Sequence, residues 1–248
     1  MSVIHGICFD LGSTLLRFDG EWDQKAIQQG VDCMVRFLTA RYDFNQSGFT
    51  EAFNAALSES RTQREIDFVE QCTRDILQRV FQEHTGRVLS DDILDQAMEA
   101  LYEVTQKAWG EMPGVQAVLD TLKDSGYRLA IISNAADAAD VHRMIQQFSL
   151  QEYFNPILIS AEEGCRKPHQ QMFNRLLEAW GVAPETVVMV GDTLNADIAG
   201  AQIAGMHQIW LRRDLRPHED PADKEHITPE QTANSLVEVP ALIENLEK

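Results

Sequence analysis

Three carboxylates in this sequence follow short apolar runs. Asp10 ends the run of residues 3–9. Asp192 ends a second run at 186–191, and Asp197 follows five residues later. At one edge of a sheet these acids would repel one another without a cation, and their hard oxygens suit Mg²⁺, which also takes water and substrate phosphate as ligands. Taken singly, Asp192 and Asp197 fit equally well as acids that cap helix N-termini.

Two further stretches have residues suited to binding an anion. Ser133 and Asn134 end an apolar strand and open a helix, where a hydroxyl and free backbone N–H groups form a natural oxyanion or phosphate site. Lys167, just before Pro168, could neutralise a phosphate and a nearby carboxylate, although spacing does not decide whether Lys167 or Arg166 points inward. Singly, a helix cap and an exposed loop lysine are the commoner roles.

The elements that must position these residues alternate between strand and helix. Alternation of this kind predicts an α/β fold with a parallel sheet covered on both faces, whose ligands bind at the carboxyl ends of strands where the strand order reverses. The tail at 216–231 is polar and rich in proline, which predicts mostly loop before a short closing helix. The predicted strands are 3–9, 127–133, a short one near 156–160, 186–191 and 207–212, and the predicted helices are 114–125, 136–148, 169–181 and 195–204.

A long insert follows the first strand. From about residue 22 to 108 there is almost no strand signal, and apolar residues recur at helical spacing within 23–42, 64–84 and 90–109. The sequence therefore predicts two domains. The core consists of residues 1–18 and 110–248, and the helical insert consists of residues 19–109.

The composition excludes some partners. The 248 residues include 39 acidic and 21 basic side chains, for a formal net charge of −18. Such a surface repels nucleic acid and anionic membranes, so we expect neither as a partner. We see no secretion signal and no apolar run approaching about 18 residues. The four cysteines are scattered, which favours a reducing cytoplasm. A monomer and a homodimer both stay open.

In their order and positions, these stretches resemble the haloacid dehalogenase superfamily, chiefly phosphatases with an aspartyl nucleophile. Its first motif, an apolar strand ending in Asp-x-Asp-x-Thr or Val, resembles "FDLGST", with Asp10 and Thr14 in place. Its other motifs resemble "IISNA", "GCRKP" and "VGDTLNAD". The likeness covers about 1–18 and 110–212. It implies a Rossmann-like core with the insert as a helical cap of the family's first type.

The resemblance implies a nucleophile and a metal site. Asp10 would attack phosphorus and form an aspartyl-phosphate. Asp10, the backbone carbonyl of Gly12 and Asp192 would hold Mg²⁺, with Asp197 in support. The substrate would be a small phosphorylated molecule.

The resemblance also implies how the phosphate is bound. Ser133 would bind a phosphoryl oxygen, helped by the backbone at Asn134. Lys167 would hold Asp10 and the phosphate in place, and Thr14 would support the site. Positioning and charge neutralisation would then do most of the catalytic work.

Gly12 departs from the family pattern. The family's phosphatases usually have a second Asp there, which protonates the leaving oxygen and then activates water; glycine cannot transfer a proton. Such acid–base catalysis is typically worth ~10²–10⁴-fold. Four hypotheses stay open: a weak or substrate-restricted Mg²⁺-dependent phosphatase, a 2-haloacid dehalogenase-like enzyme, a phosphonate hydrolase, and a catalytically reduced binding protein. The "GD" at 191–192 favours the first.

Residues of the insert enter these alternatives as candidates. A substitute proton donor could come from His84, Glu21 or Asp23, and a phosphonate hydrolase would need a cap lysine, either Lys25 or Lys107. Most cap aromatics are expected in helix packing, with one or two facing the site. Hinges for cap closure are expected at 17–20 and 110–114.

Overall fold

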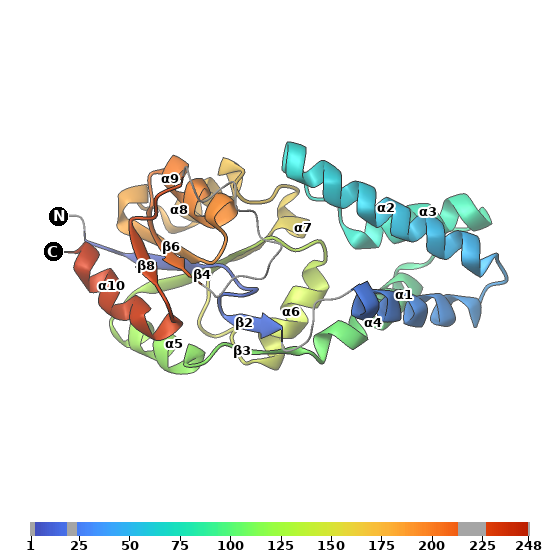
Figure 1. Cartoon of the computed structure of the whole chain (residues 1–248), viewed down its shortest axis with the longest axis horizontal. Coiled ribbons are helices and arrows are strands. Elements are labelled where there is room, and N and C mark those ends of the chain that lie inside the picture. Colours follow the sequence, from blue (N-terminus) through green and yellow to red (C-terminus); the bar gives the residue numbers. More distant parts are fainter. Residues whose placement is uncertain (1–2, 19–23, 213–226, 248) are drawn as a thin grey trace.

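The computed structural model describes residues 3–18, 24–212 and 227–247 of the chain. Its centre is a six-stranded sheet in the order β5-β4-β1-β6-β7-β8, with every neighbouring pair parallel (Figure 1). This confirms the predicted α/β class. The strands are β1 (Gly6–Phe9), β4 (Arg128–Ser133), β5 (Ile157–Ile159), β6 (Val187–Gly191), β7 (His207–Leu211) and β8 (Gln231–Ala233).

Helices cover both faces of this sheet. Apolar residues of α5, α6 and α10 form a buried cluster against one face, and those of α8 and α9 form a second cluster against the other. The predicted helices are therefore present. Their bounds are α5 (Val115–Asp124), α6 (Ala138–Gln147), α7 (Ser160–Glu163), α8 (Gln170–Trp180), α9 (Gly200–Ala204) and α10 (Val239–Leu246), with the short turns η1 (Pro184–Thr186), η2 (Leu194–Ala199) and η4 (Leu236–Glu238).

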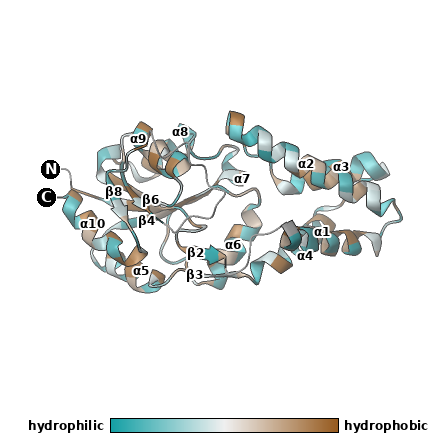
Figure 2. Cartoon of the chain, viewed as in Figure 1, coloured by the Kyte–Doolittle hydropathy of each residue, from teal (hydrophilic) through white to brown (hydrophobic). Residues whose placement is uncertain are grey.

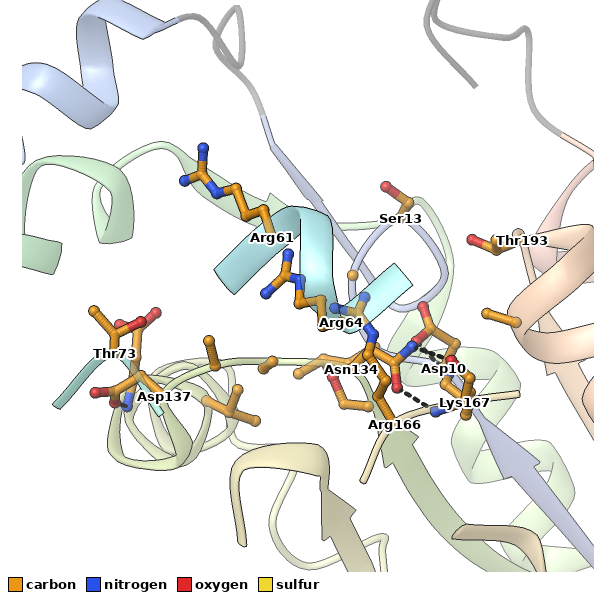
Figure 3. A pocket seen from close by; sticks show the side chains of 18 of the residues that line it. Asp10, Ser13, Arg61, Arg64, Thr73, Asn134, Asp137, Arg166, Lys167 and Thr193 are labelled. Atoms are coloured by element: carbon orange, nitrogen blue, oxygen red, sulfur yellow. Dashed lines mark hydrogen bonds and ion pairs between the residues drawn. The ribbon is translucent and has the colours of Figure 1, made fainter. Parts of the chain in front are cut away.

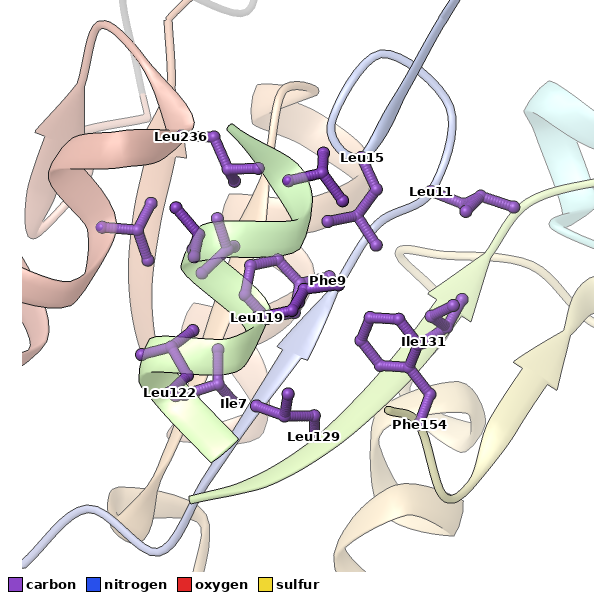
Figure 4. Close-up of a cluster of buried hydrophobic side chains, with 14 of the residues drawn as sticks. Ile7, Phe9, Leu11, Leu15, Leu119, Leu122, Leu129, Ile131, Phe154 and Leu236 are labelled. Atoms are coloured by element: carbon purple, nitrogen blue, oxygen red, sulfur yellow. The ribbon is translucent and has the colours of Figure 1, made fainter. Parts of the chain in front are cut away.

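Alternation along β1 explains why this strand is apolar throughout. Ile7 and Phe9 point to the cluster beneath α5, together with Leu129 and Ile131 of β4 (Figure 4). Cys8 points to the opposite cluster. A central parallel strand is buried on both faces, so it needs an unbroken apolar run. The first polar residue after that run marks the end of the strand.

The strand order reverses beside β1. Chain order proceeds from β1 to β4 and β5 on one side, and then returns to β6, β7 and β8 on the other. The loops after β1, β4 and β6 therefore leave the same edge of the sheet at its switch point, which is where α/β sheets bind ligands.

Helices α1 (Gln24–Thr39), α2 (Gln46–Asp67), α3 (Thr73–Thr85) and α4 (Asp91–Gln106) lie beyond that edge (Figure 1). They enclose an apolar cluster of their own, and apolar and polar residues alternate along each ribbon (Figure 2). We refer to these helices as the cap. Its most buried members include Val31, Met34, Leu38, Phe49, Phe53, Leu77 and Phe81.

One prediction within the cap was wrong. The helical spacing over 64–84 does not form one helix, because α2 ends at Asp67 and α3 begins at Thr73. Phe68 takes the left-handed conformation, with φ of 55°, and the Asp67 carboxylate accepts a hydrogen bond from the Val69 amide. The apolar period of the sequence continues across this break, so periodicity alone could not reveal it.

Two short antiparallel strands join the cap to the core. These are β2 (Leu16–Phe18) and β3 (Trp109–Glu111), paired with Arg17 opposite Gly110. Neither was predicted as a strand, because three residues are too few to show a pattern. They overlap the two segments expected as hinges.

The predicted loop at 216–231 is wrong at its last residue. Gln231 begins β8, which adds the sixth strand beside β7. Most of that predicted loop lies outside the described residues. The closing helix is present as α10, and all four cysteines are free thiols. No helix in the described ranges is long and apolar enough to cross a membrane.

Candidate active site

A buried lysine joins the ends of β1 and β4 to the turn η2, which follows β6. Lys167 is 2% exposed, and its ammonium donates to Asp10 Oδ1 at 2.8 Å and to the carbonyl of Ile132 at 2.6 Å. Its Nζ also lies 2.7 Å from Asp197 Oδ1. Lys167 therefore points inward to the acids, which the sequence left undecided. Arg166 lies beside the cap instead, 3.8 Å from Glu70.

The Asn134 side chain fixes the loop that presents this lysine. Its amide Nδ2 donates to the Lys167 carbonyl at 2.9 Å, and its Oδ1 accepts from the Lys167 backbone N–H at 2.7 Å. This reciprocal pair ties the end of β4 to the loop before α8 (Figure 3). The sequence predicts Asn134 at the phosphate site through its backbone, and no pattern in it indicates this clamp.

The three acids identified in the sequence lie together. Asp10, Asp192 and Asp197 each offer a carboxylate oxygen, and these oxygens all lie within 4.8 Å of one another. Oxygen donors at this spacing fit a hard divalent cation such as Mg²⁺. Of the three, Asp10 and Asp197 are buried and Asp192 is half-buried. The residues present therefore fit the metal that the sequence suggested.

Asp197 is held by its own turn. It lies in η2, where its Oδ2 accepts the Thr193 N–H at 3.0 Å. A Cβ added at Gly191 would lie within 2.6 Å of three Asp197 side-chain atoms, so only glycine permits this approach. The glycine in "VGD" thus makes room for the second acid of the same motif.

Burial and nearby charge act in opposite directions on the pKa values of Asp197 and Lys167. Burial raises the pKa of Asp197 to about 6, although the ammonium of Lys167 opposes the shift. For Lys167, burial favours the neutral amine, but the negative charges of Asp10 and Asp197 outweigh it and raise the pKa above its ordinary value. Lys167 therefore stays charged in its buried position.

The loop after Asp10 turns sharply. The carbonyl of Leu11 accepts from the amides of Leu15 and Leu16 at 2.9 Å, and Ser13 takes a φ of 70°. Gly12 lies outside the left-handed region, and a Cβ there would lie 3.6 Å from the Trp109 ring. Thr14, a predicted supporting residue, is fully buried, and its hydroxyl has no hydrogen-bond partner among the described residues.

A cavity of about 780 Å³ opens above these residues. The end of the sheet forms its floor, with Asp10, Ser133 and Lys167, and the cap forms the opposite wall (Figure 3). The volume is ordinary for a small-molecule site. Among the described cap aromatics, Phe68, Tyr102 and Trp109 line it, one more than the one or two expected.

The cap wall contains residues that the sequence reasoning missed. One face of α2 lines the cavity at the spacing of successive helical turns and brings Arg61 and Arg64 to it. The signal was present as two arginines three residues apart, next to apolar positions of an amphipathic helix. Alone, such a pair cannot be told from an exposed helix face. The lining positions are Leu57, Ser60, Arg61, Arg64, Glu65 and Phe68.

The break between α2 and α3 docks on the core. The Arg166 N–H donates to the Phe68 carbonyl at 3.0 Å, and the Glu70 N–H donates to the Gly164 carbonyl at 3.2 Å. The buried Glu70 carboxylate accepts from Ser160 Oγ at 2.7 Å. These contacts join the cap to the loop that contains Lys167.

The cap candidates that the structure describes do not line the cavity. His84 lies beside Phe49 in the cap helices, and Lys107 pairs with Glu103 on the surface. His84, Lys25 and Lys107 are all absent from the cavity lining among the described residues. Glu21 and Asp23 lie outside those residues. Among the described residues, the structure therefore supports neither His84 as a proton donor nor Lys25 or Lys107 as a Schiff-base lysine.

Comparison with known proteins identifies the family. The model of the haloacid dehalogenase-like hydrolases matches residues 4–205. The chain belongs to this family. The resemblance found in the sequence motifs is thereby confirmed.

Among curated members, the glyceraldehyde 3-phosphate phosphatase of Pyrococcus furiosus is 33% identical over 138 residues, 56% of this chain and 55% of that protein. The phosphoserine phosphatase of Thermus thermophilus is 38% identical over 109 residues, 44% of this chain and 43% of that protein. The chain thus spans about half the length of these relatives.

Among solved structures, the 2-haloacid dehalogenase of Pseudomonas syringae superposes with a TM-score of 0.68 at 23% identity and covers 98% of this chain and 99% of that one. At this identity the likeness shows the fold alone. The shared fold includes the cap, since nearly the whole of both chains is matched.

Proposed function

We propose that this haloacid dehalogenase-like hydrolase is a Mg²⁺-dependent phosphatase that acts on a small phosphorylated metabolite. The observation that supports it most is the contact of Lys167 with Asp10 beside the three clustered carboxylates. A nucleophilic carboxylate, a fixed cation and a metal-binding acid set at a sheet switch point together form a site for phosphoryl transfer. The two curated relatives are both named as phosphatases, which agrees with it.

The proposed reaction has two steps, and each site residue has a role in it. An Asp10 oxygen attacks phosphorus, the bond from phosphorus to the leaving oxygen breaks, and the leaving alkoxide takes a proton from water. Water then attacks the aspartyl-phosphate, which restores the Asp10 carboxylate and yields phosphate. Ser133 and the backbone at Asn134 bind phosphoryl oxygens. Lys167 orients Asp10 and balances its charge, and Asn134 also holds the Lys167 loop in place.

The proposed metal ligands are Asp10, Asp192 and the Gly12 carbonyl, with Asp197 holding the lysine beside them. Bound Mg²⁺ would neutralise charge on the phosphoryl oxygens. Gly12 offers no proton to the leaving group. We therefore infer a preference for esters whose leaving group is stable without protonation, or a low rate on the others.

We also propose that residues 19–109 act as a cap over a core of residues 1–18 and 110–248. The cap forms the upper wall of the cavity, and β2 and β3 are its two connections to the core. Closure would exclude water and select the substrate. The four free thiols agree with a reducing compartment, and we propose the cytoplasm.

A substrate screen tests the proposal. Phosphate esters, phosphonates and 2-haloacids are supplied with Mg²⁺ or with EDTA, and released phosphate and halide are measured. We expect phosphate from an aryl phosphate with Mg²⁺ and none in EDTA. Halide release without metal would establish a dehalogenase instead, and cleavage of a phosphonate would establish a phosphonate hydrolase. Binding without turnover of any compound would establish a binding protein.

A further inference from the structure

Three arginines line the same cavity as Asp10. Arg61 and Arg64 come from successive turns of α2, and Arg166 precedes Lys167 on the core side (Figure 3). The protein as a whole has a net charge of −18, so a group of cations at one cavity wall runs against its composition. Cations facing a cavity attract anionic ligands, and arginine binds carboxylates and phosphates with two parallel hydrogen bonds.

Two of these arginines have carboxylate partners within the protein. The buried Glu70 lies 3.3 Å from Arg64 Nη1 and 3.8 Å from Arg166 Nη1. Glu65 lies 3.6 Å from Arg166 Nη1. The charges of Arg64 and Arg166 are thus balanced by these two acids, which also tie the cap to the core.

Arg61 differs from its neighbours. Among the described residues, no carboxylate oxygen lies within 4.0 Å of its guanidinium. Partial burial, and then the positive charge of Arg64, lower its pKa, so both its surroundings and its neighbour disfavour the charge. An arginine is nevertheless protonated at neutral pH. The cavity therefore has a positive charge that no acid in the described parts of the chain neutralises at contact distance.

The position of Arg61 suits the far end of a substrate. The end of α2 docks beside Lys167 through the bond from the Arg166 amide to Phe68. Arg61 lies seven residues before Phe68, which at 1.5 Å per residue is about 10 Å along the helix axis. A metabolite with its phosphoryl group at Asp10 could thus extend along the α2 face toward Arg61.

We propose that Arg61, with Arg64 beside it, binds a second anionic group of the substrate, a carboxylate or a second phosphate, at the end remote from the phosphoryl group that is cleaved. This inference rests on the proposed phosphatase function and adds the substrate class. Arg61 is a specificity-determining residue in this arrangement, because it contacts the substrate away from the reacting atoms.

Matched substrates and variants test this inference. 3-Phosphoglycerate and glycerol 3-phosphate differ by a carboxylate in place of a hydroxymethyl group, and propane-1,3-diol bisphosphate and its monophosphate differ by the second phosphate. The variant is Arg61→Gln. The control is Arg79→Gln, since Arg79 is exposed, pairs with Glu83 and lies outside this cavity. Turnover is measured on each pair with Mg²⁺.

We expect kcat/KM of the unaltered protein to favour at least one substrate with the second anionic group by about tenfold or more, with the difference mainly in KM. Arg61→Gln should reduce that preference at least about fivefold, and Arg79→Gln should keep it. The substrate pair whose preference falls in Arg61→Gln shows whether the second group is a carboxylate or a phosphate. Equal preference in Arg61→Gln and the unaltered protein, or none in either, would overturn the inference.

A binding measurement separates this inference from the phosphatase proposal. The same four compounds are titrated calorimetrically into Asp10→Asn and into Asp10→Asn with Arg61→Gln, both without turnover. The inference predicts that the compound with the second anionic group binds at least about tenfold more weakly when Arg61 is also replaced. If no ester is hydrolysed but this difference is found, the phosphatase proposal fails and the anion site stands. If esters are hydrolysed but Arg61→Gln does not weaken binding, the phosphatase proposal stands and the anion site fails.

Discussion

Gly12 decides how this site can work. The residue leaves a carbonyl for metal but no carboxyl group to protonate a leaving oxygen. Its backbone lies outside the left-handed region, and among the described residues its missing Cβ would meet only the Trp109 ring, at ordinary van der Waals distance. The glycine is therefore not required by backbone conformation. A side chain can be added here, which makes its chemical consequence testable.

We predict that Gly12→Asp raises kcat on an alkyl phosphate by at least about tenfold, because a positioned acid is typically worth ~10²–10⁴-fold. An aryl phosphate, whose leaving group needs little protonation, should gain much less. Steady-state kinetics on both esters gives the comparison. Gly12→Asn is the control of equal size without a transferable proton. A gain confined to the aryl ester, or an equal gain in Gly12→Asn, would argue against the missing-acid explanation.

Asp140 provides a prediction for pH. Burial raises the pKa of this carboxyl to about 6, although the Gln106 amide opposes the shift by donating to it at 2.6 Å. A folded-state pKa above the unfolded value means that the folded protein binds the proton more tightly. This contribution to stability is full below the ordinary pKa of 3.8 and is lost as pH rises through about 6.

Asp140→Asn should remove that dependence. The unaltered protein should lose about 1 kcal/mol of unfolding free energy through this group as pH rises from about 5 to about 7.5, and the variant should not. The stability of the variant relative to the unaltered protein should therefore rise by that amount over this pH range. Asparagine can still accept the hydrogen bond from Gln106, so the contact of cap with core is kept. Urea unfolding at the two pH values measures the gain. A difference between the two proteins that does not change with pH would contradict the raised pKa.

At the scale of elements, the segment between α2 and α3 joins the cap to the core beside the cavity. Its backbone bonds to residues 164–166, and Glu70 joins Arg64 of the cap to Arg166 and Ser160 of the core. Removing Glu70 would leave two arginines without this acid at the interface. The cap contact is therefore expected to be weaker than either apolar core.

We predict that Glu70→Ala accelerates hydrogen exchange of the amides at 68–73 and 164–166 by about tenfold or more, because docking then opens more often. The amides of β1 and β4 should exchange as before. Glu83→Ala is the control, since Glu83 is an exposed cap acid paired only with Arg79 among the described residues. Unchanged protection of these two segments in Glu70→Ala would contradict the docking role of this acid.

Much of the sheet could be predicted from the sequence, because central strands require unbroken apolar runs and the site residues follow those runs directly. Asp10, Ser133 and Asp192 were found for this reason. The break at Phe68 and the strands β2, β3 and β8 were not, since short elements are determined by tertiary contacts rather than by a repeating pattern. The place of Arg61 at the cavity depends on how cap and core meet, and the Asn134 clamp depends on how the end of β4 meets the loop before α8; no local pattern records either.

At the scale of the whole molecule, a protein with a net charge of −18 brings four cationic side chains to the cavity between the sheet edge and the cap helices. Lys167 lies on the core side of the cavity and the three arginines line it between cap and core. In our proposal the three acids hold a metal, and Arg61 and Arg64 on the cap bind the second anionic end of the ligand. The sheet would then position the reacting end, and α2 the other.

The most direct test is to look for phosphate on Asp10. The protein is mixed with an aryl phosphate and Mg²⁺, quenched in acid within one turnover, and digested for mass spectrometry. We expect a phosphorylated peptide containing Asp10 in the unaltered protein, and neither this peptide nor phosphate release in Asp10→Asn. Phosphate release that persists in Asp10→Asn, or turnover with no phosphate on the Asp10 peptide, would contradict an aspartyl-phosphate mechanism.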